Sequence, residues 1–141
     1  FNSVLWYCYA DDGKDVWVAD SSLLDSPKRR ITWQRIPKNP DLFPKFGEGP
    51  AGQRLLWFSR GFYRLTTVDG KPAFIDLRFG RLKTWLRPVE PDGNDYIFLF
   101  ALKPEKLEGP YNDFGRARPK DRDGKVPWDL ILKRILGGDA D

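Results

Sequence analysis

Histidine and methionine are absent from this chain of 141 residues, and cysteine occurs once. Without an imidazole, nucleophilic catalysis of the Ser-His-Asp or Cys-His kind is excluded unless a lysine serves as the base, and the sequence singles out no such lysine. Zinc and non-haem iron sites require histidine or several cysteines, which this sequence does not offer. We therefore predict no catalytic residue, no metal ligand and no cofactor within these residues.

A long hydrophobic run is also missing. The longest apolar stretches, residues 4–10 and 96–102, hold seven residues each, whereas a membrane-spanning helix needs about 20. We therefore expect no membrane span here. The chain opens at Phe1 without methionine and shows no charged segment followed by an apolar one. We expect it to be a processed or truncated piece of a longer protein.

Apolar and aromatic residues are plentiful. They make up 40% and 15% of the chain, with six tryptophans, so we expect a folded domain with a real core. The net charge of +4 permits contact with nucleic acid or anionic lipid. Basic and acidic residues are interspersed, however, which favours an ordinary solvated surface, and we expect no nucleic-acid partner.

The first third of the chain has the pattern of strands. Residues 4–10 and 16–19 are apolar runs separated by the turn sequence DDGKD, which predicts a hairpin. Residues 31–36 predict a third strand, ended by the prolines of PKNP.

A short helix is predicted next, within residues 51–62. Gly61 stands where a C-terminal cap belongs. The apolar residues at helical spacing are Ala51, Leu55, Phe58 and Phe62.

Two strands joined through Asp69 and Gly70 form the clearest predicted hairpin. A two-residue turn would pair Arg64 with Ile75 and mix apolar with charged side chains on each face. A three-residue loop, residues 68–70, with Gly70 left-handed, would instead gather the charged side chains on one face. We predict the three-residue loop.

The second half contains one more strand, a loop and a helix. Residues 96–102 are apolar on both faces, so we predict a central strand. Residues 103–126 are rich in charge, proline and glycine and predict a long surface loop. A helix is predicted from Pro127 to its end at Gly137. Its apolar residues recur at helical spacing: Trp128, Ile131, Leu132, Ile135 and Leu136.

Together these elements predict a single α+β domain over residues 1–141. Residues 1–103 form a mostly antiparallel sheet of five or six strands with a short central helix. Residues 104–126 form the charged loop, and residues 127–137 form a C-terminal helix, with the helices packed on one face of the sheet.

The glycines at positions 47, 49 and 52 spell a G-x-G-x-x-G motif ahead of the predicted helix. Such a motif can seat a pyrophosphate on a helix N-terminus when it follows a strand. Here a proline-rich loop precedes it, Pro50 removes one of the amides, and no βαβ unit follows. We therefore reject a dinucleotide site.

Arg64, Asp76 and Arg78 form the one charged group that could have a chemical role, because they stand among apolar residues of the predicted hairpin. Spare guanidinium donors beside Asp76 could contact an anion or a partner. The alternative, which we favour, is a structural salt bridge that fastens the hairpin.

Six segments resemble a known family: FNSVLWYCYA, SLLD, LLWFSRGFY, IDLRFG, YIFLFAL and LILKRILGG. They are similar to the C-terminal soluble region of the bacterial membrane-bound metal-dependent hydrolases, also described as LexA-binding, inner-membrane-associated hydrolases. The most specific pieces are residues 2–6 and residues 76–80, where Phe79 stands at a position we associate with methionine. Asp76, Arg78 and Gly80 are family-typical positions of unknown role.

This resemblance implies a regulatory, substrate-positioning or interaction domain that is not catalytic alone. It further implies transmembrane helices that come earlier in the longer protein and carry the histidines and aspartates for a divalent metal. The expected partner is that transmembrane domain, with the membrane surface as a second contact. The expected location is the inner membrane, with this domain on the cytoplasmic side.

Two other functions remain as alternatives. An independent carboxylate-dependent hydrolase would need two acidic groups in different environments of one cleft. A nucleic-acid-binding module would need basic and aromatic residues on one surface, and Asp121 and Asp123 interrupt the most basic stretch.

Overall fold

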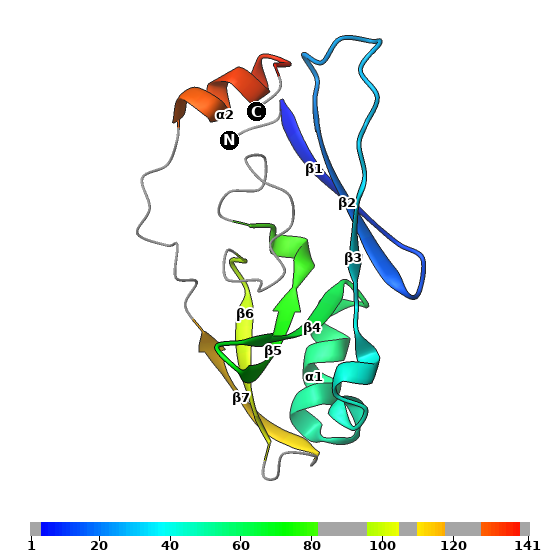
Figure 1. Cartoon of the computed structure of the whole chain (residues 1–141), viewed down its shortest axis with the longest axis vertical. Helices are drawn as coiled ribbons and strands as arrows, with labels where there is room; N and C mark the ends of the chain where they lie inside the picture. The colour runs from blue at the N-terminus through cyan, green and yellow to red at the C-terminus, as the bar shows by residue number, and fades with distance from the viewer. Residues whose placement is uncertain (1–3, 82–95, 105–109, 118–127, 139–141) are drawn as a thin grey trace.

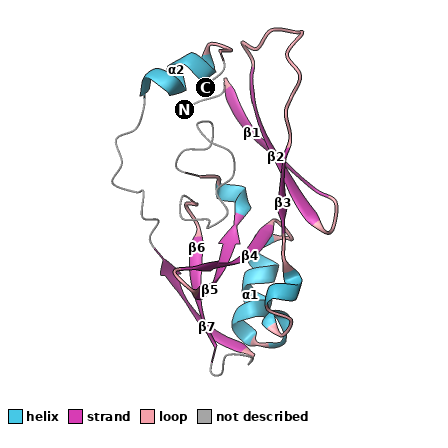
Figure 2. Ribbon diagram, in the orientation of Figure 1, coloured by secondary structure: helices cyan, strands magenta, loops and turns pink. Residues whose placement is uncertain are grey.

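The computed structural model describes residues 4–81, 96–104, 110–117 and 128–138. Its helices and strands are shown in Figures 1 and 2. Along the chain they are β1 (Leu5–Asp11), β2 (Asp15–Ser22), β3 (Gln34–Pro37), η1 (Pro40–Leu42), η2 (Phe46–Glu48), α1 (Pro50–Ser59), β4 (Tyr63–Val68), β5 (Lys71–Asp76), η3 (Leu77–Phe79), β6 (Leu99–Pro104), β7 (Tyr111–Ala117) and α2 (Trp128–Ile135).

The strands form two antiparallel sheets, which confirms the α+β class and the antiparallel pairing predicted from the sequence. The first sheet has the order β1-β2-β3, and the second has the order β4-β5-β6-β7. The described residues therefore hold seven strands in two sheets, where we expected five or six strands in one.

The additional strand is β7, and it lies in a segment that we predicted to be loop. That prediction is wrong for Tyr111–Ala117, which pairs antiparallel with β6. β7 is the last strand in the order of the described sheet, and Tyr111 is its only fully buried residue. Its apolar signal in the sequence is therefore weak. The rest of the predicted loop, except for Lys103, Pro104 and Pro110, lies outside the described residues.

The other predicted strands are confirmed. β1 and β2 form the first hairpin, where the Asp12 carboxylate accepts hydrogen bonds from the backbone N–H groups of Lys14 and Asp15. β3 begins three residues later than predicted, at Gln34, and ends at Pro37. β6 lies between β5 and β7, as expected for a central strand.

The register that we predicted for the β4–β5 hairpin is wrong. Val68 pairs with Lys71 across a two-residue turn, and Arg64 consequently pairs with Ile75. Asp69 and Gly70 both have positive φ, at 51° and 72°, which is the conformation of the type I′ turn that suits the twist of a hairpin. The prediction assumed that the charged side chains gather on one face of the hairpin, whereas both faces are covered by apolar side chains.

That coverage comes from two separate hydrophobic clusters, one on each face of the second sheet. Between the two sheets lie Val16, Val18, Ile36, Ala73, Ile75, Leu77, Tyr96 and Leu99. Between the second sheet and the α1 region lie Phe46, Leu55, Leu65, Phe74, Leu102 and Tyr111. Since the first cluster draws on both sheets, the two sheets share one core.

The predicted short helix is confirmed as α1. It ends where Arg60 adopts the left-handed conformation, with φ of 52°, followed by Gly61 with φ of 87°. The G-x-G-x-x-G residues at its start serve close packing. A Cβ atom at Gly52 would lie 1.6 Å from the carbonyl oxygen of Phe46, and one at Gly49 would lie 2.3 Å from that of Tyr111. These glycines let backbone segments touch, which explains them without a phosphate ligand.

The predicted C-terminal helix is also present, as α2. Only part of its apolar stripe turns inward, however. Ile131 and Ile135 are half-buried, while Trp128, Leu132 and Leu136 are exposed. The most deeply buried of the α2 side chains described is instead Arg134.

Candidate functional site

The structure places Asp76 and Arg78 together at the end of β5. Asp76 is fully buried and caps the η3 turn by accepting the backbone N–H of Arg78 at 3.1 Å. The same carboxylate accepts two bonds from the Arg78 guanidinium, from Nε at 3.0 Å and from Nη2 at 2.6 Å. The two side chains form a bidentate ion pair within a single turn of the chain.

Aromatic rings hold the guanidinium of Arg78 in place. Its Cζ atom lies 5.0 Å from the ring centre of Phe58 and 5.3 Å from that of Phe79, within the range of a cation–π interaction. The hydrogen bonds with Asp76 raise the pKa of Arg78 against the effect of its burial. This geometry favours the structural ion pair over an open anion site. An anion or partner contact at Arg78 stays a prediction.

Arg64 does not join this pair. Its register partner is Ile75, whereas Asp76 pairs with Tyr63, so the two charged residues lie on opposite faces of the hairpin. Arg64 is on the face toward the first sheet, with Ala73 and Ile75. The three residues that we predicted as one charged group therefore lie on two faces of the hairpin. The prediction grouped them because it assumed the wrong register.

A groove of about 270 Å³ opens near the ion pair, between α1 and the last two strands. Its walls are almost entirely apolar and aromatic. Trp57 at its edge is 79% exposed and Phe58 is 38% exposed. The residues that line it are Arg54, Leu55, Trp57, Phe58, Phe100 and Phe114.

A series of neighbouring aromatic rings connects this groove with the ion pair. Phe114 meets Phe100 edge to face at 5.5 Å, and Phe100 lies 6.2 Å from Phe98. Phe98 in turn stacks on Phe79 at 4.0 Å, and Phe79 stacks on Phe58.

Arginines accompany these rings. The Cζ atom of Arg116 lies 5.0 Å from the Phe98 ring centre, and Arg54 is exposed at the groove. We call the whole assembly the aromatic–arginine surface. It consists of Arg54, Trp57, Phe58, Arg78, Phe79, Phe98, Phe100, Phe114 and Arg116.

Sequence reasoning found only part of this surface. Arg78 was singled out, together with its partner Asp76, and Phe58 was named among the apolar residues at helical spacing. Phe114 and Arg116 were missed because they belong to β7, the strand predicted as loop. The signal for them was an aromatic residue and an arginine two positions apart, which share a face only once the segment is known to be extended.

Two searches within the described part of the chain were negative. No group of three or more Asp, Glu or Cys side chains there could hold a metal ion. No helix there has the length and apolar character to cross a membrane.

Comparisons with known protein families, curated proteins and solved structures found no match. The resemblance to membrane-bound metal-dependent hydrolases therefore stays a prediction from the sequence.

Proposed function

We propose that this chain is an interaction domain that docks an apolar segment of a partner into the aromatic–arginine surface. The resemblance described above suggests the partner: the membrane portion of a metal-dependent hydrolase at the inner membrane, with this domain on the cytoplasmic side. Any divalent metal and any bond-breaking would then belong to that portion. The observation that carries the proposal is the groove beside Trp57.

The exposure of the groove supports docking rather than enclosure of a substrate, because Trp57 is 79% exposed and Phe58 is 38% exposed. Its volume of about 270 Å³ lies near the lower end of the range of about 300 to 1,000 Å³ that is usual for ligand pockets. It would accept one bulky side chain of a partner. Tryptophan and arginine residues often dominate the binding energy at such anchor points, and Trp57 and Arg54 stand at this one.

The charges of the surface add a preference for the partner. Arg54 and Arg116 are exposed beside the rings, so an apolar segment that carries a carboxylate or phosphate would be favoured over a neutral one. The guanidinium of Arg78 is already paired with Asp76, so the two exposed arginines would make this contact.

The alternative of an independent carboxylate-dependent hydrolase has less support. Asp76 is a buried carboxylate, and both of its oxygens accept bonds from Arg78. A carboxylate held in this way is fully hydrogen-bonded and away from solvent, which suits a structural part better than proton transfer.

The proposal can be tested by photo-crosslinking in the longer protein. A benzophenone amino acid replaces Trp57 at the groove, and a control places it at Leu42, which is exposed on η1. We expect Trp57 crosslinks to a membrane-embedded segment, and their loss when Arg54 is changed to glutamate. Equal crosslinks from both positions would contradict the docking site, and crosslinks to nucleic acid would favour a nucleic-acid-binding module instead.

A further inference from the structure

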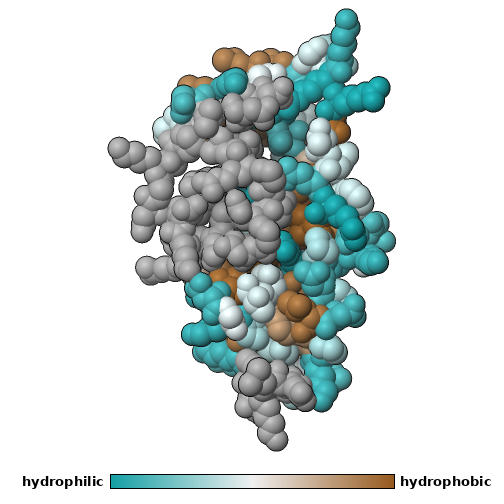
Figure 3. All heavy atoms as spheres, viewed as in Figure 1, coloured by the Kyte–Doolittle hydropathy of each residue, from teal (hydrophilic) through white to brown (hydrophobic). Residues whose placement is uncertain are grey.

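Another exposed apolar surface among the described residues lies on α2, at the end opposite α1 (Figure 1). Trp128 is 66% exposed, Leu132 is 55% exposed and Leu136 is 70% exposed. These residues are four positions apart and form one stripe along the helix. In Figure 3 hydrophobic residues lie at this end of the molecule, with hydrophilic residues beside them.

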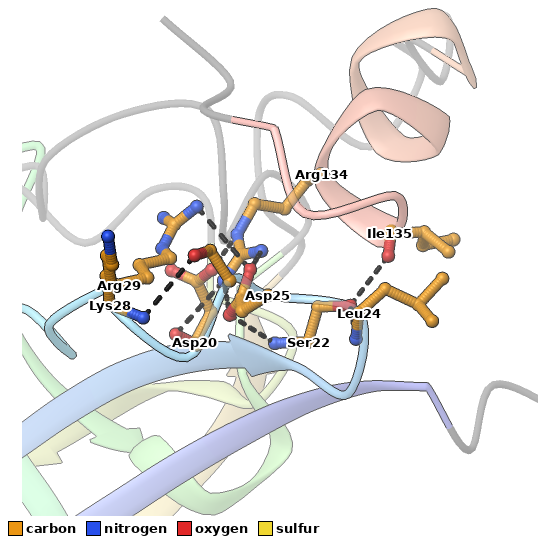
Figure 4. A network of polar contacts seen from close by, with 9 residues as sticks. Asp20, Ser22, Leu24, Asp25, Lys28, Arg29, Arg134 and Ile135 are labelled. Atoms are coloured by element: carbon orange, nitrogen blue, oxygen red, sulfur yellow. Dashed lines mark hydrogen bonds and ion pairs between the residues drawn. The ribbon is translucent and has the colours of Figure 1, made fainter.

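A polar clamp holds α2 in this orientation (Figure 4). The Arg134 side chain is only 2% exposed, and its guanidinium binds the carboxylates of Asp20 and Asp25. Ser22 donates its hydroxyl to the carbonyl oxygen of Ile135 at 2.6 Å. Since Arg134 occupies the inward face, the Trp128 stripe must point toward solvent.

The loop after β2 extends the apolar stripe. Leu23 and Leu24 are 71% and 54% exposed. The loop touches the end of the helix, because a Cβ atom at Gly137 would lie 2.5 Å from the carbonyl oxygen of Leu24. We call the combined area the α2 surface. It consists of Leu23, Leu24, Trp128, Leu132 and Leu136.

Basic side chains occur on the two elements that form this surface. Lys28 and Arg30 are exposed on the loop that carries Leu23 and Leu24, Lys133 is exposed on α2, and Asp129 is an exposed acidic side chain on α2. The charges of Arg134 and Arg29 are balanced by those of Asp20 and Asp25. The three exposed basic side chains then outnumber Asp129, so the balance of the described side chains is positive at an apolar surface that includes a tryptophan.

We propose that the α2 surface binds an anionic lipid bilayer. Trp128, Leu132 and Leu136 would enter the interfacial region, while the two lysines and the arginine contact the headgroups. A helix with tryptophan and leucine on one face and basic residues beside them has the composition of an interfacial helix. A second copy of this chain is a poorer occupant, because the same basic residues would face each other across a symmetric contact.

Co-sedimentation with vesicles tests this proposal. The chain is mixed with vesicles of phosphatidylcholine alone and with vesicles that also contain an equal amount of phosphatidylglycerol. We expect binding to the anionic vesicles, weakened by salt, and little binding to the neutral ones. The double variant Leu132→Ser with Leu136→Ser should reduce binding by about tenfold or more, because two leucines no longer become buried.

A second variant, Lys28→Glu with Arg30→Glu, should remove the preference for anionic vesicles. Because all four substituted side chains are exposed, circular dichroism should confirm an unchanged fold. Equal binding to both vesicles, no binding to either, or full binding by the leucine variant would overturn the proposal. A dimer that the leucine variant abolishes would also overturn it, in favour of a second copy.

The aromatic–arginine surface provides a control for this test. Trp57→Ser, which changes that surface at the opposite end of the molecule, should bind vesicles as the original chain does. Loss of vesicle binding in this control would show that the α2 surface is not the contact.

Discussion

At the scale of single residues, the Asp76 and Arg78 pair is the clearest case in which a charge serves the fold. The carboxylate is fully buried, and a buried carboxylate is tolerated when it is paired and hydrogen-bonded. Its partner stands two positions away, so the pair needs only a tight turn to form. That proximity made it predictable, whereas the place of Arg64 depends on the register of a different strand.

Removing Arg78 from this pair should be costly. We expect Arg78→Gln to lower the free energy of unfolding by about 3 kcal/mol, because a buried carboxylate loses its charged partner. Urea denaturation measures the change. The matched control is Lys103→Gln, which breaks the exposed ion pair with Asp113 and should leave stability without a measurable change. Similar losses in both variants would contradict the special role of Arg78.

The second prediction at this scale concerns Gly52. Gly52→Ala should destabilise the protein by at least about 2 kcal/mol, although alanine is normally the better helix former, because its Cβ would meet the carbonyl of Phe46. Gly47→Ala is the control, since its Cβ would meet only Leu56 Cδ1 at 3.4 Å. Chemical denaturation of the two variants compares them. A dinucleotide role for the motif would not predict this difference.

At the scale of elements, periodicity predicted the helices correctly and identified most strands. It did not predict which side of α2 faces the protein. The apolar stripe alone would place Trp128 and Leu132 inward, but the Arg134 clamp turns α2 so that they face solvent. Neither Asp20 nor Asp25 is near Arg134 in sequence. β7 shows the same limit, because an edge strand with few buried residues has little periodic signal.

The clamp of α2 should depend on pH. The hydrogen bond from Arg134 lowers the pKa of Asp25 below its ordinary 3.8, with Arg29 contributing and burial opposing. A carboxyl group whose pKa is lower in the folded state stabilises that state above the unfolded pKa and loses this contribution as pH falls through the folded pKa. We therefore expect α2 to loosen in acid, below about pH 3.8.

Amide NMR shifts of α2, followed from neutral to acidic pH, measure this loosening. The matched variant Asp25→Asn should remove much of the pH-dependent step and weaken α2 docking at neutral pH. The backbone Ser22 N–H and the side chains of Arg29 and Arg134 face Asp25 in the native protein. An unchanged titration of α2 in the variant would show that another group controls it.

At the scale of the whole molecule, the two sheets are joined by one hydrophobic cluster. Val16, Val18 and Ile36 from the first sheet pack with Ile75 and Leu99 from the second. Two sheets that share buried side chains lose stability together when either is disturbed. The molecule also presents its two candidate surfaces at opposite ends, so one domain could hold a partner and a bilayer at once.

This shared core predicts cooperative unfolding. Ile36→Ala, in the first sheet, should lower the free energy of unfolding by about 3 kcal/mol. The transitions seen by tryptophan fluorescence and by far-ultraviolet circular dichroism should shift together. Leu42→Ala, at a position 48% exposed, is the control and should shift neither. Two separate transitions in the variant would mean that the sheets unfold independently.

The sequence by itself determined the local features of this protein: the α+β class, the hairpins, the two helices and the pairing of Asp76 with Arg78. These depend on residues within a few positions of one another, where periodicity and turn chemistry act directly. Only the tertiary structure decided the register of β4 and β5, the strand β7, the orientation of α2 and the assembly of the aromatic–arginine surface. Each of these depends on which distant segment covers a given face, and a pattern along the chain does not contain that information.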